Sequence, residues 1–176
     1  MGKPAALSIA RDITERKEAE AKLRESEARY RELINNMRGG VAVYQASDEG
    51  ADFIIRDMNR AGLRITDTQK EAVIGKSVKQ AFPQVEAFGL FKVLQEVWRT
   101  GQPQRHPVSF YKDERLALWA DNYVYKLPSG EVVAIFNDVT ERKWAEDALR
   151  ESEERHRLLF DNAGLGIGYY TPRARP

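Results

Sequence analysis

The chain has no cysteine among its 176 residues, and this absence excludes several kinds of chemistry. Disulfides, thiolate nucleophiles and zinc sites with cysteine ligands are ruled out. Only two histidines occur, so a metal site made of several histidines is not expected. No nucleophile, base and orienting group form a recognisable catalytic set, and we therefore predict that this chain is not itself an enzyme.

The chain also lacks a long apolar run and an excess of charge of one sign. No stretch approaches the roughly 20 apolar residues of a membrane-spanning helix, and the N-terminus does not read as a signal peptide. The 28 Lys and Arg residues balance the 27 Asp and Glu residues to a net charge of +1. We expect a cytoplasmic protein, on its own or within a membrane-anchored receptor, without nucleic-acid partners or direct membrane contact.

Charged residues make up 31% of the sequence, and they are concentrated in a segment that occurs twice. Residues 12–44 and 138–170 are identical at 18 of 33 positions, which indicates tandem copies of one structural unit. Five parts are predicted: the tail of a preceding unit or appended residues at 1–11, a linker helix at 12–37, a complete domain at 38–138, a second linker helix at 139–163, and the truncated start of a following unit at 164–176.

Each repeated segment is predicted to be a helix, because strong helix formers dominate it and the spacing at its start is that of a capping box. The candidate caps, which would also couple each helix to its neighbouring domain, are Asp12, Thr14, Glu15, Asp138, Thr140 and Glu141. An apolar stripe with alternating spacings of four and three residues follows in both copies. It consists of Ala19, Leu23, Ser26, Tyr30, Leu33 and Met37, and of Ala145, Leu149, Ser152, His156, Leu159 and Ala163.

Two interpretations of this stripe remain open. An amphipathic helix can lie on its own domain, or two chains can pair as a short parallel coiled coil in a homodimer. The small seam residues Ala19 and Ser26 make the coil weak, which suits a switch that shifts register at low cost. His156 is expected to pack in the seam, where its titration near neutral pH would bias the pairing.

Between the linkers the sequence predicts an α+β domain with an antiparallel sheet. Runs rich in β-branched and aromatic residues predict strands at 41–46, 53–55, 108–112, 116–127 and 132–136. Residues 59–82 suit short helical turns, and 88–99 has a helical period that stops at Gly101. Strands separated in sequence from helices are typical of the α+β class.

Four motifs of this segment resemble those of the PAS domain family. They are Asn59-Arg60-Ala61 after the second strand, Ile74-Gly75 before a helix, Thr100-Gly101 before the third strand, and the Asp-Ile/Val-Thr-Glu-Arg-Lys motif at 12–17 and 138–143. The resemblance implies a PAS fold, with a five-stranded antiparallel sheet, short helices on one face and flanking signalling helices, in a tandem-PAS bacterial sensor. It further implies a two-component histidine kinase as the output, or next a GGDEF-type diguanylate cyclase or phosphodiesterase.

The resemblance also raises the question of cofactors. Flavin–cysteinyl photochemistry is excluded because the chain has no cysteine. Haem-binding relatives place an axial histidine on the helix before the third strand, and residues 88–99 contain none. His106 lies beyond that helix, so we expect a surface or strand-start histidine rather than a ligand. No cofactor is identifiable from the sequence, and a small ligand of unknown identity stays a candidate.

Aromatic residues are the candidates for lining a ligand cavity, although each of them also suits an ordinary core. The predicted pocket residues are Phe82, Phe88, Phe91, Trp119, Tyr123 and Tyr125, with Asn122 or Asp121 as a polar contact inside the cavity. Asn59 is expected to cap the short helix that follows it.

Two functions follow from these expectations. In the first, a ligand or the preceding unit changes the domain, and strand 132–136 passes the change into the helix that starts near Asp138. In the second, the domain is a ligand-free dimerisation module and spacer. A cavity of about 300 Å³ or more would favour the sensor, and a filled interior would favour the spacer.

Overall fold

The computed structural model describes residues 3–164, and its centre is a five-stranded antiparallel sheet with strand order β2-β1-β5-β4-β3. The strands are β1 (Gly40–Ser47), β2 (Asp52–Met58), β3 (Gln104–Lys112), β4 (Ala117–Lys126) and β5 (Val132–Asp138). The predicted α+β class and antiparallel sheet are confirmed, and every predicted strand overlaps an observed one. Strand β5 lies in the centre of the sheet, paired with β1 on one side and with β4 on the other.

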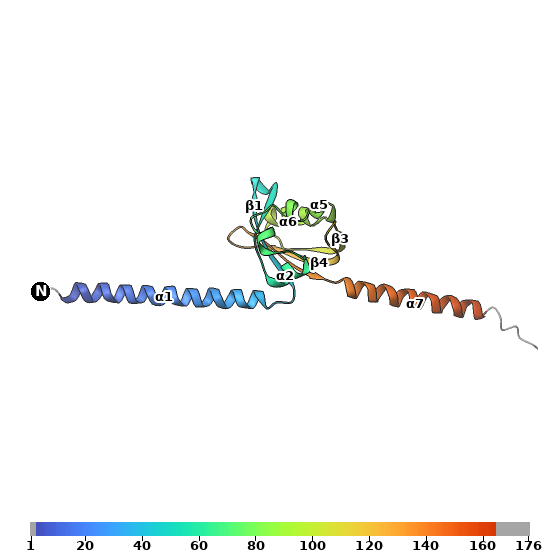
Figure 1. The fold of residues 1–176 in the computed structure, drawn as a ribbon, viewed down its shortest axis with the longest axis horizontal. Coiled ribbons are helices and arrows are strands. Elements are labelled where there is room, and N and C mark those ends of the chain that lie inside the picture. Colours follow the sequence, from blue (N-terminus) through green and yellow to red (C-terminus); the bar gives the residue numbers. More distant parts are fainter. Residues whose placement is uncertain (1–2, 165–176) are drawn as a thin grey trace, which may run out of the picture. The chain divides into compact units, whose positions relative to one another are not determined.

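Helices fill the connection between β2 and β3, and α5 and α6 lie together on one side of the sheet (Figure 1). They are α2 (Arg60–Ile65), α3 (Lys70–Val73), α4 (Val78–Ala81), α5 (Val85–Phe88) and α6 (Leu90–Thr100), and a 3-10 turn, η1 (Asp48–Gly50), joins β1 to β2. Gly101 ends α6 with a φ of 72°, a left-handed conformation that glycine adopts without strain, as the sequence predicts.

The core lies between the helices and the inner face of the sheet. Phe53, Ile55, Leu94 and Val97 are fully buried there, and the ring of Phe91 packs edge-on against that of Phe53 with the centroids 5.7 Å apart. Burying each such side chain contributes about 1.5–3 kcal/mol. The inner face of β4 carries Leu118, Ala120, Asn122 and Val124, all buried. One polar residue therefore interrupts an otherwise apolar row.

Two long helices flank the sheet domain in sequence. The contacts between residues divide the chain into two compact units, with the boundary between Asp138 and Val139. The first, α1 (Lys3–Asn35), starts well before residue 12. The prediction that Asp12 caps a helix is therefore wrong, because the helix continues through it. The second, α7 (Thr140–Gly164), begins where the repeat predicts. The predicted following unit at 164–176 lies, apart from Gly164, outside the described residues.

Both stripes of the linker helices are exposed to solvent. Leu23, Tyr30 and Leu33 of α1, and Leu149 and Leu159 of α7, each have about 60% of their surface exposed. Within residues 3–164, no helix combines the length and the apolar character that crossing a membrane would require.

Asn59 joins three elements of the domain through one buried side chain. Its Oδ1 accepts hydrogen bonds from the N–H groups of Gly62 (2.8 Å) and Val41 (2.9 Å). Its Nδ2 donates to the carbonyl oxygens of Ile34 (2.9 Å) and Gly39 (3.0 Å). The predicted helix cap is confirmed at α2, and the same amide also holds the last turn of α1 and the start of β1.

Candidate functional site

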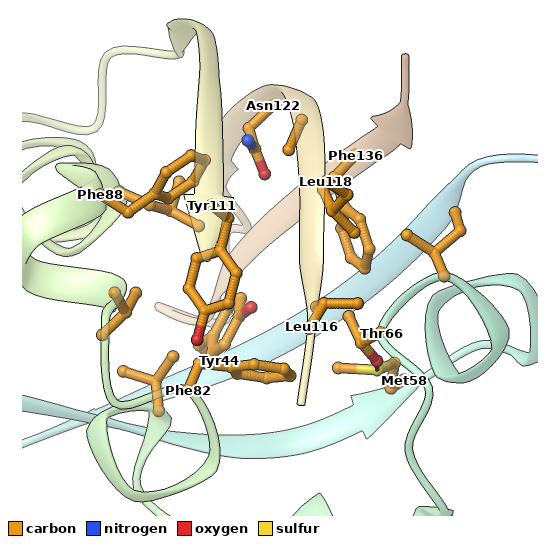
Figure 2. A pocket seen from close by; sticks show the side chains of 15 residues that line it. Tyr44, Met58, Thr66, Phe82, Phe88, Tyr111, Leu116, Leu118, Asn122 and Phe136 are labelled. Carbon is orange, nitrogen blue, oxygen red and sulfur yellow. Dashed lines mark hydrogen bonds between the residues drawn. The ribbon is translucent and has the colours of Figure 1, made fainter. Parts of the chain in front are cut away.

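A cavity of about 60 Å³ lies between the inner face of the sheet and the short helices, and Figure 2 shows the side chains around it. Its fifteen lining residues come from all five strands, from α2, α4, α5 and α6, and from the loops between them. Aliphatic and aromatic side chains dominate the lining, and no charged residue belongs to it. The cavity is therefore a small apolar space with few polar groups.

Two of the polar groups in the lining are already satisfied by the protein. The Thr66 hydroxyl donates to the carbonyl oxygen of Gly62 (2.8 Å) and lies 2.9 Å from the Thr68 hydroxyl. The Tyr111 hydroxyl donates to the Asp113 carboxylate (2.7 Å). This bond and, above all, burial raise the pKa of Tyr111, so its hydroxyl stays protonated at neutral pH. Neither group needs a partner from inside the cavity.

Two other polar groups in the lining are left without such partners. Asn122 is only 3% exposed, and its Nδ2 makes no hydrogen bond to any described residue. Tyr44 is also 3% exposed, and burial by itself raises the pKa of its hydroxyl. Buried polar groups without partners are costly and therefore rare in proteins. These two groups are the polar contacts that the cavity offers to an occupant.

Three of the predicted pocket residues, Phe82, Phe88 and Asn122, line the cavity. Phe91 packs in the core against Phe53 and is absent from the described lining of this cavity. Trp119, Tyr123 and Tyr125 occupy the opposite face of β4, so their assignment to the pocket is wrong. Successive residues of a strand alternate between faces, and the inward set is the one that contains Asn122 rather than the aromatic one.

Sequence reasoning missed several lining residues, among them Tyr44, Met58, Thr66 and Tyr111. Tyr44 and Tyr111 belong to predicted strands. The alternation of inward and outward residues along these strands was the signal that would have identified them as lining residues. Thr66 follows α2, and no sequence pattern places it at the cavity. The outer aromatic residues form pairs of their own, with ring centroids 5.4 Å apart for Phe110 and Trp119 and 6.0 Å apart for Tyr123 and Tyr125.

His106 lies near the start of β3, as predicted, but it is buried rather than on the surface. Its Nε2 donates to the carbonyl oxygen of Phe88 (3.0 Å), and its ring lies 4.7 Å from the Phe88 ring. Its Nδ1 has no hydrogen-bond partner among the described residues. Burial lowers the pKa of His106, an effect that the bond to Phe88 partly offsets. His106 pairs directly with Asn122 across β3 and β4.

The other candidate site is the junction between β5 and α7. Asp138 is the last residue of β5 and pairs with Ala120 of β4, and Thr140 already belongs to the helix. The carbonyl oxygen of Val139 accepts the hydrogen bond from the Lys143 N–H (2.9 Å), so Val139 is the residue that immediately precedes α7, and the predicted caps Asp138 and Thr140 lie on either side of it. The direct passage from strand to helix is confirmed, with a single residue between them.

Comparison with known proteins agrees with this architecture. The PAS fold family matches residues 38–143, which is more than half of the chain. The chain belongs to the PAS fold family. The match begins at the start of the predicted domain and extends through the β5–α7 junction, so it includes the first turn of α7.

Individual relatives are more distant. Sporulation kinase E of Bacillus subtilis (strain 168) is 25% identical over 150 residues, and the match covers 85% of this chain but only 20% of the kinase. A domain of a sensory box sensor histidine kinase/response regulator from Geobacter sulfurreducens is 17% identical with a TM-score of 0.51, over 66% of this chain and 96% of that domain. The PAS domain of an HTR-like protein from Haloarcula marismortui is 16% identical with a TM-score of 0.50, over 69% and 98%.

The lowered pKa of His106 predicts a pH dependence of stability. The folded domain binds this proton less readily than the unfolded chain, so the contribution of His106 to stability is constant above its unfolded pKa of 6.5 and falls as the pH drops below that value. We expect the unfolding free energy to decrease between pH 7 and pH 5, and His106→Gln, which keeps a donor for Phe88, to reduce that decrease.

His156 provides the matched control, because it is the only other histidine and its side chain is exposed on α7. Urea unfolding at several pH values measures the effect. An equal reduction in His156→Gln, or none in His106→Gln, would show that burial of His106 does not cause the pH dependence.

Proposed function

We propose that this PAS domain is a sensory relay that converts a change in its cavity, or in the helix that precedes it, into a movement of α7. The observation that carries this proposal is the path of β5. This strand is hydrogen-bonded on both sides in the middle of the sheet and enters α7 after Val139 alone. A loop would absorb a small shift of the sheet, and this junction has none.

We place the module in a sensor histidine kinase that acts in the cytoplasm. The similarity to sporulation kinase E and to a domain of a sensory box sensor histidine kinase supports this output over a diguanylate cyclase or phosphodiesterase. The chain spans about a fifth of the length of the kinase that it matches, so the output is assigned to a part of the protein outside this chain. The module itself needs no catalytic group for this role.

We further propose that the linker helices pair in a parallel homodimer. The leucines of their stripes repeat with coiled-coil spacing and are about 60% exposed. The ion pairs Arg16–Glu20 and Arg142–Glu146 involve none of the stripe residues. A second chain is the partner that buries both stripes at once.

A second candidate function, the ligand-free spacer, is favoured by one observation. The cavity of about 60 Å³ is far smaller than the pockets of about 300–1,000 Å³ that hold drug-sized ligands. A spacer would share the fold, the dimer and the junction with the sensor, and would differ only in being insensitive to its interior. The two functions are therefore separated by changing the interior and reading the output.

Ala120→Leu makes that change, because Ala120 lines the cavity and a larger side chain fills it. In the full-length protein we expect this substitution to change autophosphorylation at least about threefold, which corresponds to a shift of roughly 0.6 kcal/mol between signalling states. Inserting Gly-Gly-Ser between Asp138 and Val139 should abolish the difference in autophosphorylation between Ala120→Leu and the original protein, because the flexible residues separate the sheet from α7.

The control is the same insertion after Ser129, in the turn between β4 and β5, which should leave the effect of Ala120→Leu intact. If Ala120→Leu has no effect on output in the uninterrupted protein, the output is insensitive to the cavity, as the ligand-free spacer requires. If its effect survives the insertion at the junction, the signal does not travel from β5 to α7. Either result overturns a relay from the cavity to α7.

The dimer prediction is tested within α7. Leu149 belongs to the stripe and Leu158 does not, although both side chains are about equally exposed, at 62% and 60%. We expect Leu149→Asp to raise the dimer dissociation constant at least about tenfold in sedimentation equilibrium, because a charge enters the apolar seam. Leu158→Asp should have little effect. Equal effects of the two substitutions would rule out this seam.

A further inference from the structure

We propose that the cavity binds a small neutral molecule with an apolar body and one hydroxyl or amide group, which Asn122 and Tyr44 hold by hydrogen bonds. This inference rests on the proposed sensory function, because it names the class of molecule that would provide the input. It follows from three properties of the cavity: its charge, its size and the position of its free polar groups.

The absence of charge in the lining selects a neutral ligand. None of the fifteen lining residues is Asp, Glu, Lys, Arg or His. An ion that entered would lose its hydration without meeting a counter-charge, and this cost is large in an apolar environment. A carboxylate, a phosphate or an ammonium group is therefore rejected, and a neutral ligand of the same shape is accepted.

The volume limits the size of the ligand. One water molecule needs a cavity of at least about 10–15 Å³. The volume of about 60 Å³ is several times that minimum but far below that of a drug-sized pocket, so the ligand is a small molecule. Most of its atoms contact aromatic and aliphatic side chains, such as Phe82, Phe88 and Phe136, so the body of the ligand is apolar.

The polar part of the ligand is set by Asn122 and Tyr44. Figure 2 shows the amide end of Asn122 and the hydroxyl end of Tyr44 turned toward the space between the other lining side chains. A side-chain amide and a phenol can each donate and accept, and rotation of the amide exchanges its two functions. A ligand hydroxyl or amide has the same double capacity, so it can bond to either protein group, whereas an alkane bonds to neither.

The hydrogen bonds of the neighbouring polar groups make this selection specific. Thr66 and Tyr111 also line the cavity, but their hydroxyl groups already donate to Gly62 and Asp113. Only Asn122 and Tyr44 therefore gain a first partner when a ligand enters, among the polar groups described in this lining. Asn122 is a buried polar residue in an otherwise apolar row of β4. Its unpaired amide lowers stability unless an occupant of the cavity supplies a hydrogen bond.

The test uses isobutyramide as the probe and the isobutyrate anion, which has nearly the same shape, as the charged comparison. Both are titrated into the isotope-labelled 176-residue chain at pH 7, and amide chemical shifts are followed by NMR. We expect saturable shifts at residues of the cavity with isobutyramide, and at least about tenfold weaker binding of isobutyrate. Xenon, which binds without hydrogen bonds, reports whether the apolar space itself is accessible.

Asn122→Leu keeps the size of the side chain and removes its polar group. We expect it to weaken isobutyramide binding at least about tenfold while xenon binding and the melting temperature are retained or increased, since no unpaired amide is then buried. Asn137→Leu is the matched control, because Asn137 lies on β5 with its side chain exposed, and it should bind isobutyramide like the original chain. Tyr44→Phe is a second variant with an expected loss of the same sign.

Three results overturn the inference: no saturable isobutyramide binding, equal binding of isobutyramide and isobutyrate, or unchanged binding in Asn122→Leu. In the first case the Asn122 amide is hydrated by water or simply left unpaired. These failures are distinguishable from failure of the relay, because the relay experiment fills the cavity through Ala120→Leu and reads α7 without any ligand.

Discussion

The attachment of the first linker helix to the sheet depends on the amide of Asn59. The last carbonyl groups of a helix have no hydrogen-bond partner within the helix, and neither do its first N–H groups. Asn59 meets both needs, because it donates to Ile34 at the end of α1 and accepts from Gly62 at the start of α2. Its further bonds to Val41 and Gly39 fix the start of β1. No other common side chain of this size donates twice and accepts twice.

From this point the elements form a continuous path across the domain. Asn59 holds the start of β1, residues 40–44 of β1 pair with residues 132–136 of β5, and β5 continues into α7. The cavity lies beside that path, since Tyr44 and Phe136 belong to these two strands and also line it. In the proposed relay, the preceding helix and an occupant of the cavity would therefore act on the same pair of strands.

Much of the fold was accessible from the sequence because its signals are local. Strand composition, the glycine after α6 and the repeated linker each depend on neighbouring residues, and so does the cap at Asn59. The lining of the cavity was less accessible. Tyr123 and Asn122 are adjacent in β4, and only the packing of the sheet against the helices decides which of them faces inward. The start of α1 also escaped, because Asp12 has cap-like spacing while the helix begins at Lys3.

The most direct test of this account is the free energy of unfolding of Asn59→Asp in urea. Aspartate keeps the two accepted hydrogen bonds of Oδ1 and loses the two donated to Ile34 and Gly39, and its charge then faces their carbonyl oxygens. The account predicts a loss of about 2–3 kcal/mol. Asn36→Ala, at an exposed asparagine just after α1 whose Nδ2 donates only to Glu32, should change stability by no more than about 0.5 kcal/mol. Equal losses in the two variants would contradict the role of Asn59 as the tie between the first linker helix and the sheet.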